Sequence, residues 1–335
     1  LAIGASYGQQ RSWSDALAYI SLAVGAVTAI AFPFVMARRP HPLVPLRLFR
    51  SRNFSVTNIS TLVIYGSLYV TFLFNGLFLQ GTIGYTAAAA GLVGIPGSIL
   101  LTLFSARVGK ISARYGPRWF MAIGPTLMGV GVLWLARVPS STTPWHLVPT
   151  QVSSFVPPAG YLVDLLPGLL LFGVGLTVMV APLTTALMTS VPAHNSGLAS
   201  AINNAVSRVG PQLAGAVIFV AITGSFYSGL ASRLPGTNPS AQSVRARIAP
   251  LNQPVATASI GGVSGSRLQQ AARDASTDAY HLAMLVGAAL LFIGAIVNAL
   301  GIRNPTPASG GSPVAAREPR SVNPGRDAPV TGDAS

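Results

Sequence analysis

The sequence predicts an all-α fold, a polytopic membrane helix bundle with seven transmembrane helices. Half of the 335 residues are hydrophobic, only 8% are charged, and the mean hydropathy is +0.56. Ordinary soluble domains carry about a quarter charged residues, so this composition excludes an ordinary soluble enzyme. The chain has no cysteine, which excludes disulfides and thiolate metal sites.

Seven apolar segments are long enough to cross a bilayer, whose core of about 30 Å needs about 20 residues of helix. Gly and Pro interrupt several of them, which membrane helices tolerate better than soluble helices do. The predicted spans are 16–36, 54–79, 87–108, 119–137, 161–190, 198–223 and 279–302.

The short loops predict the orientation, because cytoplasmic loops are enriched in Lys and Arg. Nine basic residues fall on one side, in the loops after the first and third spans, against only Arg11 and Arg137 on the other. The nine are Arg38, Arg39, Arg47, Arg50, Arg52, Arg107, Lys110, Arg114 and Arg118. We therefore expect a plasma (inner) membrane protein with the N-terminus of this chain outside and its C-terminus in the cytoplasm.

The remaining segments complete the predicted organisation. Residues 1–53 form an external lead-in, one helix and a basic cytoplasmic loop, and residues 54–303 form a six-helix unit. Within that unit, residues 224–278 are expected to be a long external loop with one amphipathic helical stretch near Arg267. Residues 304–335 lack apolar periodicity and are expected to be a disordered cytoplasmic tail. The net charge of +14 is distributed between apolar blocks, which favours a membrane surface over nucleic acid.

Two stretches carry a family resemblance. Residues 39–54, RPHPLVPLRLFRSRNF, resemble the segment that enters the C-terminal half of fourteen-span drug/proton antiporters of the major facilitator superfamily. Residues 109–118, GKISARYGPR, resemble the superfamily's cytoplasmic loop motif, whose positions here are Gly109, Arg114, Gly116 and Arg118. The acidic position of the motif is Ala113, so the usual contact between a carboxylate and a helix cannot form here.

The resemblance implies that residues 54–303 are the C-terminal half of a transporter, built from two inverted three-helix repeats. The first span would be a linker helix, and the N-terminal half of the same transporter would be missing. Gly124, Gly129 and Gly131 lie on the wrong helix for the family's antiporter signature. We interpret them as small residues that let helices approach closely.

Candidate substrate-contacting residues lie on two spans. In the span 54–79 a stripe of polar and aromatic residues recurs at helical spacing, namely Asn58, Thr61, Tyr65, Tyr69 and Phe72. This stripe predicts either a substrate path, with the rings stacking on flat hydrophobic or cationic compounds, or polar contacts between helices. The span 198–223 carries a second dense polar patch that includes Asn203, Asn204, Ser207 and Arg208.

Arg208 lies near mid-bilayer by residue count, where an arginine is costly unless it reaches water or a polar partner. We expect it to face a hydrated cavity, carbonyls freed by Pro211 or a carboxylate of the missing half, with Asn204 and Ser207 able to hold it. Proton-driven transport needs an embedded titratable group, and Asp164 lies at an external span end. The coupling carboxylate is therefore predicted to belong to the missing half.

These features predict a transmembrane transporter, a proton-coupled exporter of hydrophobic or cationic drugs working by alternating access. The expected partners are the lipid bilayer, a small-molecule substrate, protons and the missing half; no cofactor, metal, nucleic acid or enzymatic activity is expected. Two alternatives stay open: an exporter of a dedicated metabolite or lipid, and a seven-span membrane sensor or accessory protein.

Overall fold

A computed structural model of the chain describes residues 16–38, 45–235, 238, 244, 248–251, 263 and 265–304. The expected lead-in before residue 16 and the expected disordered tail beyond Asn304 lie outside these residues, as do residues 39–44 of the basic loop. Seven helical segments are long and apolar enough to cross a membrane, which confirms the predicted all-α polytopic class.

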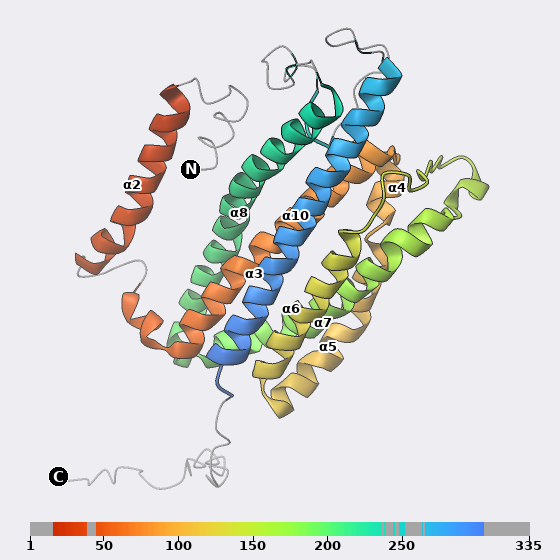
Figure 1. Ribbon diagram of the computed structural model, residues 1–335. Helices are drawn as coiled ribbons and strands as arrows, with labels where there is room; N and C mark the ends of the chain where they lie inside the picture. Colours follow the sequence, from red (N-terminus) through yellow and green to blue (C-terminus); the bar gives the residue numbers. More distant parts are fainter. Residues whose placement is uncertain are drawn as a thin grey trace, which may run out of the picture. The chain divides into compact units, whose positions relative to one another are not determined.

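The elements are helices throughout (Figure 1). The α-helices are α2 (Ala16–Arg38), α3 (Arg52–Leu77), α4 (Ala87–Leu92), α5 (Ile95–Tyr115), α6 (Pro117–Leu135), α7 (Leu166–Thr189), α8 (Ser196–Arg233) and α10 (Gly265–Gly301). Short 3-10 helices are η1 (Leu46–Arg50), η3 (Val152–Phe155) and η5 (Ala193–Asn195), and π-helical turns are η2 (Phe78–Ile83) and η4 (Tyr161–Leu165).

Two predicted boundaries differ from the structure. The segment 87–108 is not one helix, because a turn at Val93–Gly94 separates α4 from α5. The expected external loop 224–278 is shorter at both ends: α8 continues to Arg233, and α10 already begins at Gly265. The predicted helical stretch near Arg267 is the first part of α10. Both helices continue beyond their apolar segments, because a bilayer needs only about 20 residues of helix and both are longer.

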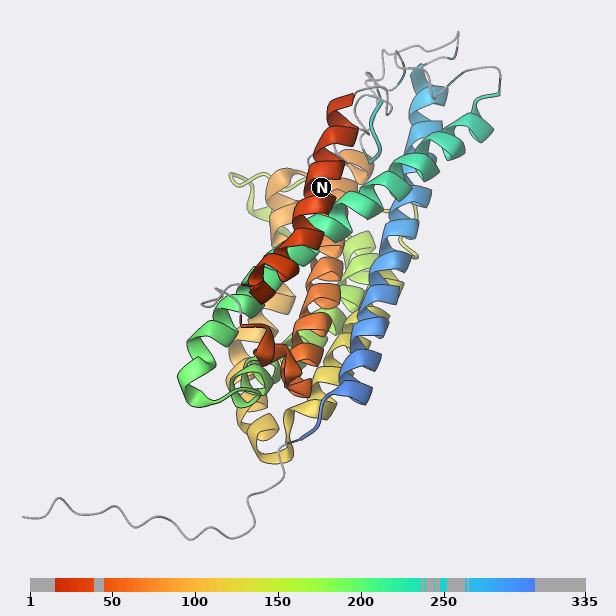
Figure 2. The ribbon, with the colours of Figure 1, turned by 90° about the vertical axis from the view of Figure 1, so that its left-hand side faces the viewer.

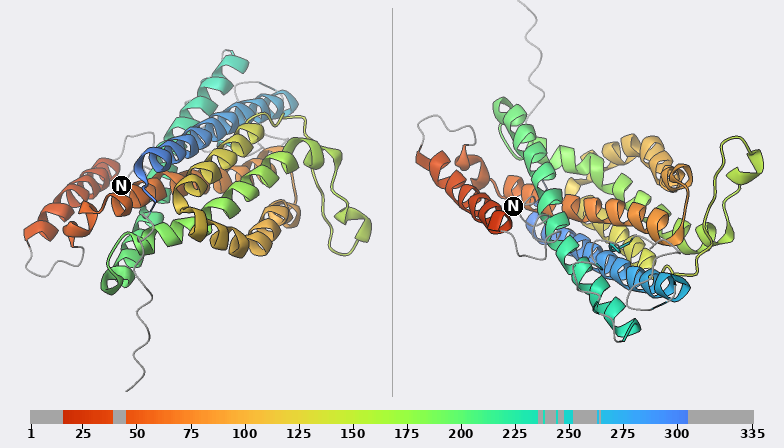
Figure 3. Two further views of the ribbon diagram at one scale, coloured as in Figure 1. Left: turned by 90° about the horizontal axis from the view of Figure 1, so that it is seen from below. Right: turned by 90° about the horizontal axis from the view of Figure 1, so that it is seen from above.

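The bundle has two layers. Helices α8, α3, α7 and α5 form one layer in that order, and α10 and α6 form the second, with α10 against α3 and α8 and α6 against α7 (Figure 3). Helix α8 crosses the direction of α10 obliquely (Figure 2). Helix α2 contacts η1 and exposes apolar side chains such as Val27 and Ile30 along its length.

We name the two ends of the bundle by their chemistry. The basic end is where α3 and α8 begin and α5 and α10 end, and it carries Arg52, Lys110, Arg114, Arg118 and Arg303. The cap end is where α7 and α10 begin. All acidic residues in the described part of the chain lie at the cap end, namely Asp164, Asp274 and Asp278.

Several of the main contacts between helices repeat when the helices are exchanged in pairs, while the α8–α10 contact is much more extensive than its counterpart α5–α6. If α3 is exchanged with α7, α5 with α8 and α6 with α10, the α3–α8 contact becomes α7–α5. The same exchange turns the α3–α10 contact into α7–α6, and it leaves the α6–α10 contact unchanged. Two groups of three consecutive helices therefore pack in related ways.

Glycines determine how closely α6 approaches α7. A Cβ atom added to Gly131 would lie 2.5 Å from the carbonyl oxygen of Gly168, and one added to Gly124 would lie 2.8 Å from that of Gly175. Gly129 faces α10 instead, where an added Cβ would meet the ring of Phe292 at 2.9 Å. The interpretation of Gly124, Gly129 and Gly131 as close-packing residues is confirmed.

An ordered loop, residues 136–160, covers the cap end. Trp145 and Leu147 of this loop are buried. Thr86 is bonded to both, because its N–H donates to the carbonyl of Trp145 at 3.2 Å and its Oγ1 accepts the N–H of Leu147 at 3.1 Å. The indole N–H of Trp145 donates to Ser154. This loop therefore folds back onto the bundle.

Candidate functional site: the stripe of α3 and the outward face of α8

The predicted stripe of α3 lies opposite the side that packs on α10. On the α10 side, Ser67 donates to the carbonyl of Gly287 at 2.6 Å, and Ile64 packs against Gly294. The five stripe residues occupy the other side of α3, where its neighbours in the layer are α7 and α8. The periodicity therefore identifies a real face of the helix.

The end of the stripe nearest the basic end is a polar contact between helices. The amide of Asn203 on α8 donates to Asn58 Oδ1 at 3.2 Å and to Thr61 Oγ1 at 3.0 Å. Asn58 and Thr61 are buried, and Asn58 also donates to the carbonyl of Phe54. These groups bond to one another, so this part of the stripe joins α3 to α8.

The aromatic part of the stripe is more open. Phe72 is 57% exposed and meets Phe172 of α7 edge to face, with ring centroids 5.5 Å apart. Tyr69 packs on Gly215 of α8, where an added Cβ would lie 2.7 Å from its ring, and it keeps 37% of its surface exposed. Tyr65 is half-buried beside Leu183. The structure therefore divides the stripe into a bonded polar part and a partly open aromatic part.

The patch predicted on α8 also divides. Asn203 turns toward α3, whereas Asn204, Arg208 and Gln212 are exposed and, at intervals of four residues, share one side of the helix. We call these three residues the outward face of α8. Arg208 lies 12 residues after Ser196, which is about 18 Å along the helix axis.

Arg208 has no hydrogen bond or ion pair to any residue that the structure describes. The structure does not show the predicted contact of Arg208 with Asn204 and Ser207. The Ser207 hydroxyl donates instead to the backbone carbonyl of Asn204 at 2.9 Å. Pro211 lies inside α8 and cannot donate to the carbonyl four residues earlier, that of Ser207.

The loop motif residues have separate structural roles. Gly116 joins α5 to α6 with φ of 89°, a conformation that side chains disfavour, and Gly109 packs against Ala181 of α7. Arg118 Nε donates to the carbonyl of Ala299 at 2.8 Å, near the end of α10. Arg114 is exposed and lies over the ring of Tyr115. The motif thus connects four helices, α5, α6, α7 and α10, at the basic end.

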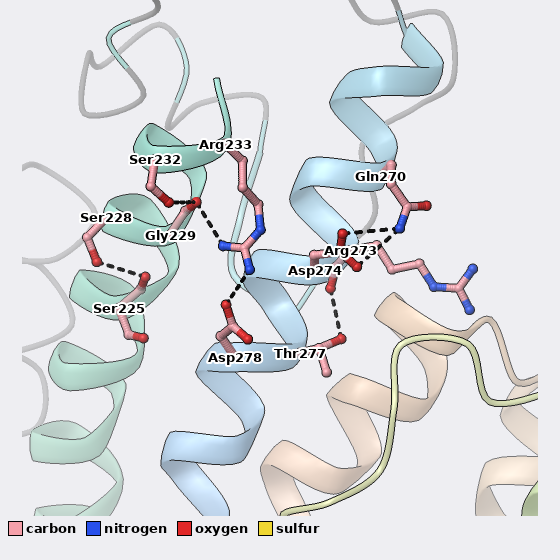
Figure 4. Close-up of polar contacts among 10 residues, drawn as sticks. All are labelled: Ser225, Ser228, Gly229, Ser232, Arg233, Gln270, Arg273, Asp274, Thr277 and Asp278. Atoms are coloured by element: carbon pink, nitrogen blue, oxygen red, sulfur yellow. Dashed lines mark hydrogen bonds and ion pairs between the residues drawn. The ribbon is translucent and has the colours of Figure 1, made fainter. Parts of the chain in front are cut away.

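The sequence did not predict the polar contacts of the cap end. Asp164, at the start of the fifth predicted span, accepts a hydrogen bond from Thr142 of the covering loop at 2.9 Å. Burial raises the pKa of Tyr85 to about 12, with smaller contributions from Tyr161 and Asp164, so the phenol stays neutral at physiological pH. Arg233 and Asp278 form an ion pair of 2.6 Å between α8 and α10 (Figure 4).

No group of metal-binding side chains occurs in the described residues. Helices α3 and α8 present aromatic faces, amides and one guanidinium, which can recognise a ligand, within a bundle of membrane-length helices. These features define a polytopic α-helical membrane protein, as the spans predicted.

The chain belongs to the Major Facilitator Superfamily, whose sequence pattern it matches over residues 2–215. It is 28% identical over 211 residues to the multidrug resistance protein Stp of Mycobacterium tuberculosis, covering 63% of this chain and 36% of Stp. It is 27% identical to the cephamycin export protein CmcT of Amycolatopsis lactamdurans over 236 residues, which is 70% of this chain and 45% of CmcT. It is 26% identical to the puromycin resistance protein pur8 of Streptomyces alboniger over 237 residues, which is 69% of this chain and 43% of pur8. The aligned part is less than half the length of each of these relatives.

Proposed function

We propose that the chain is the C-terminal part of an exporter of hydrophobic or cationic small molecules that works by alternating access. The observation that carries this proposal is the outward face of α8. A guanidinium deep in a bilayer costs about 2.5–3.5 kcal/mol on insertion scales, so hydrocarbon is a poor neighbour for Arg208. Water in a transport cavity, or a polar surface of another part of the transporter, relieves this cost.

A missing N-terminal half supplies such a surface. The chain spans less than half the length of its curated relatives, and its six consecutive helices α3 to α10 (α4 and α5 together crossing once) exchange in pairs as two inverted repeats would. On this proposal residues 54–303 are one half of a fourteen-span transporter, and α2 is a linker helix. The two halves rock about a central site between them.

The substrate class rests on the aromatic part of the α3 stripe and on the relatives. Tyr69 and Phe72 present partly open rings that suit flat apolar compounds and cations, without a fixed set of buried polar partners. Such a surface accepts many compounds. Relatives named for multidrug resistance, cephamycin export and puromycin resistance support export of small organic molecules.

The proposed orientation places the basic end in the cytoplasm, in accord with its arginines and lysine. The N-terminus of this chain is then outside and the C-terminus inside the plasma membrane. Protons drive export in this proposal, and the titratable group that couples them belongs to the N-terminal half.

Dye efflux from cells that express the full-length protein tests the function. We expect efflux that stops when the proton gradient is collapsed, and little efflux from the present chain alone. Phe72→Ala is expected to change which dyes are exported, whereas Leu73→Ala, an exposed neighbour outside the stripe, is not. Export of a single metabolite or lipid but no dye would favour a dedicated exporter. A complete reading frame that starts at Leu1 would favour a sensor or accessory protein.

A further inference from the structure

An apolar groove of about 300 Å³ lies between α6 and α10, near the basic end. Ala122, Ala295 and Ala299 are small and form part of the lining, beside the larger Trp119, Ile123 and Ile296. The hydroxyl of Thr126, which also lines the groove, donates to the carbonyl of Ala122 in its own helix. The groove therefore offers almost no polar group to an occupant.

One arginine lies at the end of this groove, and two more lie at the same end of α10. Arg118 Nε donates to the carbonyl of Ala299, a lining residue, and its guanidinium lies 5.2 Å from the ring centroid of Trp119, another lining residue. Arg52 donates from Nε to the carbonyl of Gly301 and from Nη2 to that of Leu300. Arg303 follows directly in sequence and is exposed.

The positive charge of these arginines is larger than the partial negative charge at the C-terminus of α10. The C-terminus of an α-helix carries a partial charge equivalent to about −0.5, which cations stabilise. Two guanidinium groups, those of Arg52 and Arg118, cap α10, and Arg303 follows the helix, so this end of the bundle attracts anions. An apolar groove with an arginine at its end, stacked on a tryptophan of the lining, matches the chemistry of a phospholipid in one leaflet.

We propose that the α6–α10 groove binds an anionic phospholipid of the cytoplasmic leaflet. One acyl chain lies along the alanines of the groove, and the phosphate lies beside Arg118, with Arg52 and Arg303 adding to the attraction. The bound lipid fixes the end of α10 against α6. This site lies on the α10–α6 layer, away from the α3 stripe, and it is independent of what the protein transports.

A second copy of the chain is a poorer occupant. A two-fold symmetric contact through this face would bring the same arginines of both copies toward each other, since an isologous interface uses the same patch twice. Like charges at an interface disfavour association. The charge pattern therefore selects an anionic lipid.

Brominated lipids test the proposal, because bromine on an acyl chain quenches the fluorescence of a nearby tryptophan. The full-length protein, with Trp119 as its sole tryptophan, is placed in phosphatidylcholine vesicles that contain a small fraction of brominated phosphatidylglycerol or brominated phosphatidylcholine. We expect the anionic lipid to quench about fivefold more effectively, the preference that one basic residue near the surface provides. A variant with only Trp134, at the other end of α6, is the positional control. Arg137 lies over its ring there without the groove, so its preference for the anionic lipid should be clearly smaller than that of Trp119.

Substitutions assign the preference to the groove. Arg118→Gln should abolish the preference for the anionic lipid, and Arg118→Lys should keep most of it. The matched control Arg114→Gln, in the same loop motif, should leave it unchanged. Ala299→Leu fills the groove and should reduce quenching by both lipids. Equal quenching of Trp119 by the two lipids would overturn the proposal. Protection of Trp119 from both lipids would also overturn it, because protein would then cover the groove.

Discussion

Helices α8 and α10 are similar in length and contact each other, yet α8 exposes a polar face as well as apolar side chains such as Val209 and Val217. The exposed side of α10 is apolar through the membrane-length part of the helix, with Leu285, Ala289, Ile293, Ile296 and Leu300 at intervals of three and four residues. The outward face of α8 carries Asn204, Arg208 and Gln212 at the same kind of spacing. Hydrocarbon suits the first surface and not the second.

The difference shows that exposed side chains in this bundle have two kinds of expected surroundings. On the exposed side of α10 we expect lipid to cover the side chains, and on the outward face of α8 we expect water or another part of a transporter to cover them. The two layers place these surfaces on different sides of α3. The same substitution, such as the introduction of an arginine, should therefore have a different effect on membrane insertion on each of the two faces.

The largest effect is expected from Ile293→Arg. It places a guanidinium on the lipid-facing side of α10 and should cost about 2.5–3.5 kcal/mol of membrane insertion. Gln212→Arg is the matched control on the outward face of α8, where repulsion by Arg208 should cost only a few tenths of a kcal/mol. Insertion is measured as the membrane-integrated fraction of the full-length protein. Equal losses for both variants would show that the outward face of α8 also faces lipid.

A somewhat smaller effect is expected from Arg208→Ala in the full-length protein. Hydrogen bonds to charged groups contribute about 1.5–3 kcal/mol, so loss of this guanidinium should reduce efflux by about tenfold or more. Membrane insertion should stay normal, and Arg208→Lys should restore part of the efflux. Arg137→Ala, at the cap end, is the control for loss of an exposed arginine. Normal efflux in both Arg208 variants would contradict a transport role for this residue.

A modest effect is expected from Asn203→Ala, which removes the bonds to Asn58 and Thr61. Polar contacts between membrane helices contribute about 0.6 kcal/mol on average and up to about 1.7 kcal/mol. Thermal unfolding in detergent should therefore occur at a slightly lower temperature. Asn204→Ala, the next residue on the outward face, should leave the unfolding temperature unchanged while it alters efflux. A larger loss of stability for Asn204→Ala would mean that the two asparagines have exchanged roles.

The sequence predicts spans and faces well because both depend on local periodicity. Apolar length predicts the seven helices, and spacing predicts the stripe of α3. The partner of each polar residue is harder to predict, since the bond from Asn203 to Thr61 requires that α3 and α8 be neighbours. The capping of α10 by Arg118 depends on the same kind of long-range contact. Hydropathy marks only the part of a helix that crosses the membrane and does not show where the helix itself ends. The predicted loop 224–278 was therefore longer than the loop between α8 and α10.

The smallest effect is expected from Asp164→Asn, which tests whether proton coupling lies within this chain. The carboxylate accepts a hydrogen bond from Thr142, so the structure ties it to the loop that covers the cap end, not to the stripe of α3 or the outward face of α8. An asparagine side chain keeps the acceptor oxygen for that bond. Proton exchange and efflux by the full-length protein should therefore remain near their original rates. Loss of proton exchange with intact substrate binding would instead place the coupling group at Asp164, within this chain.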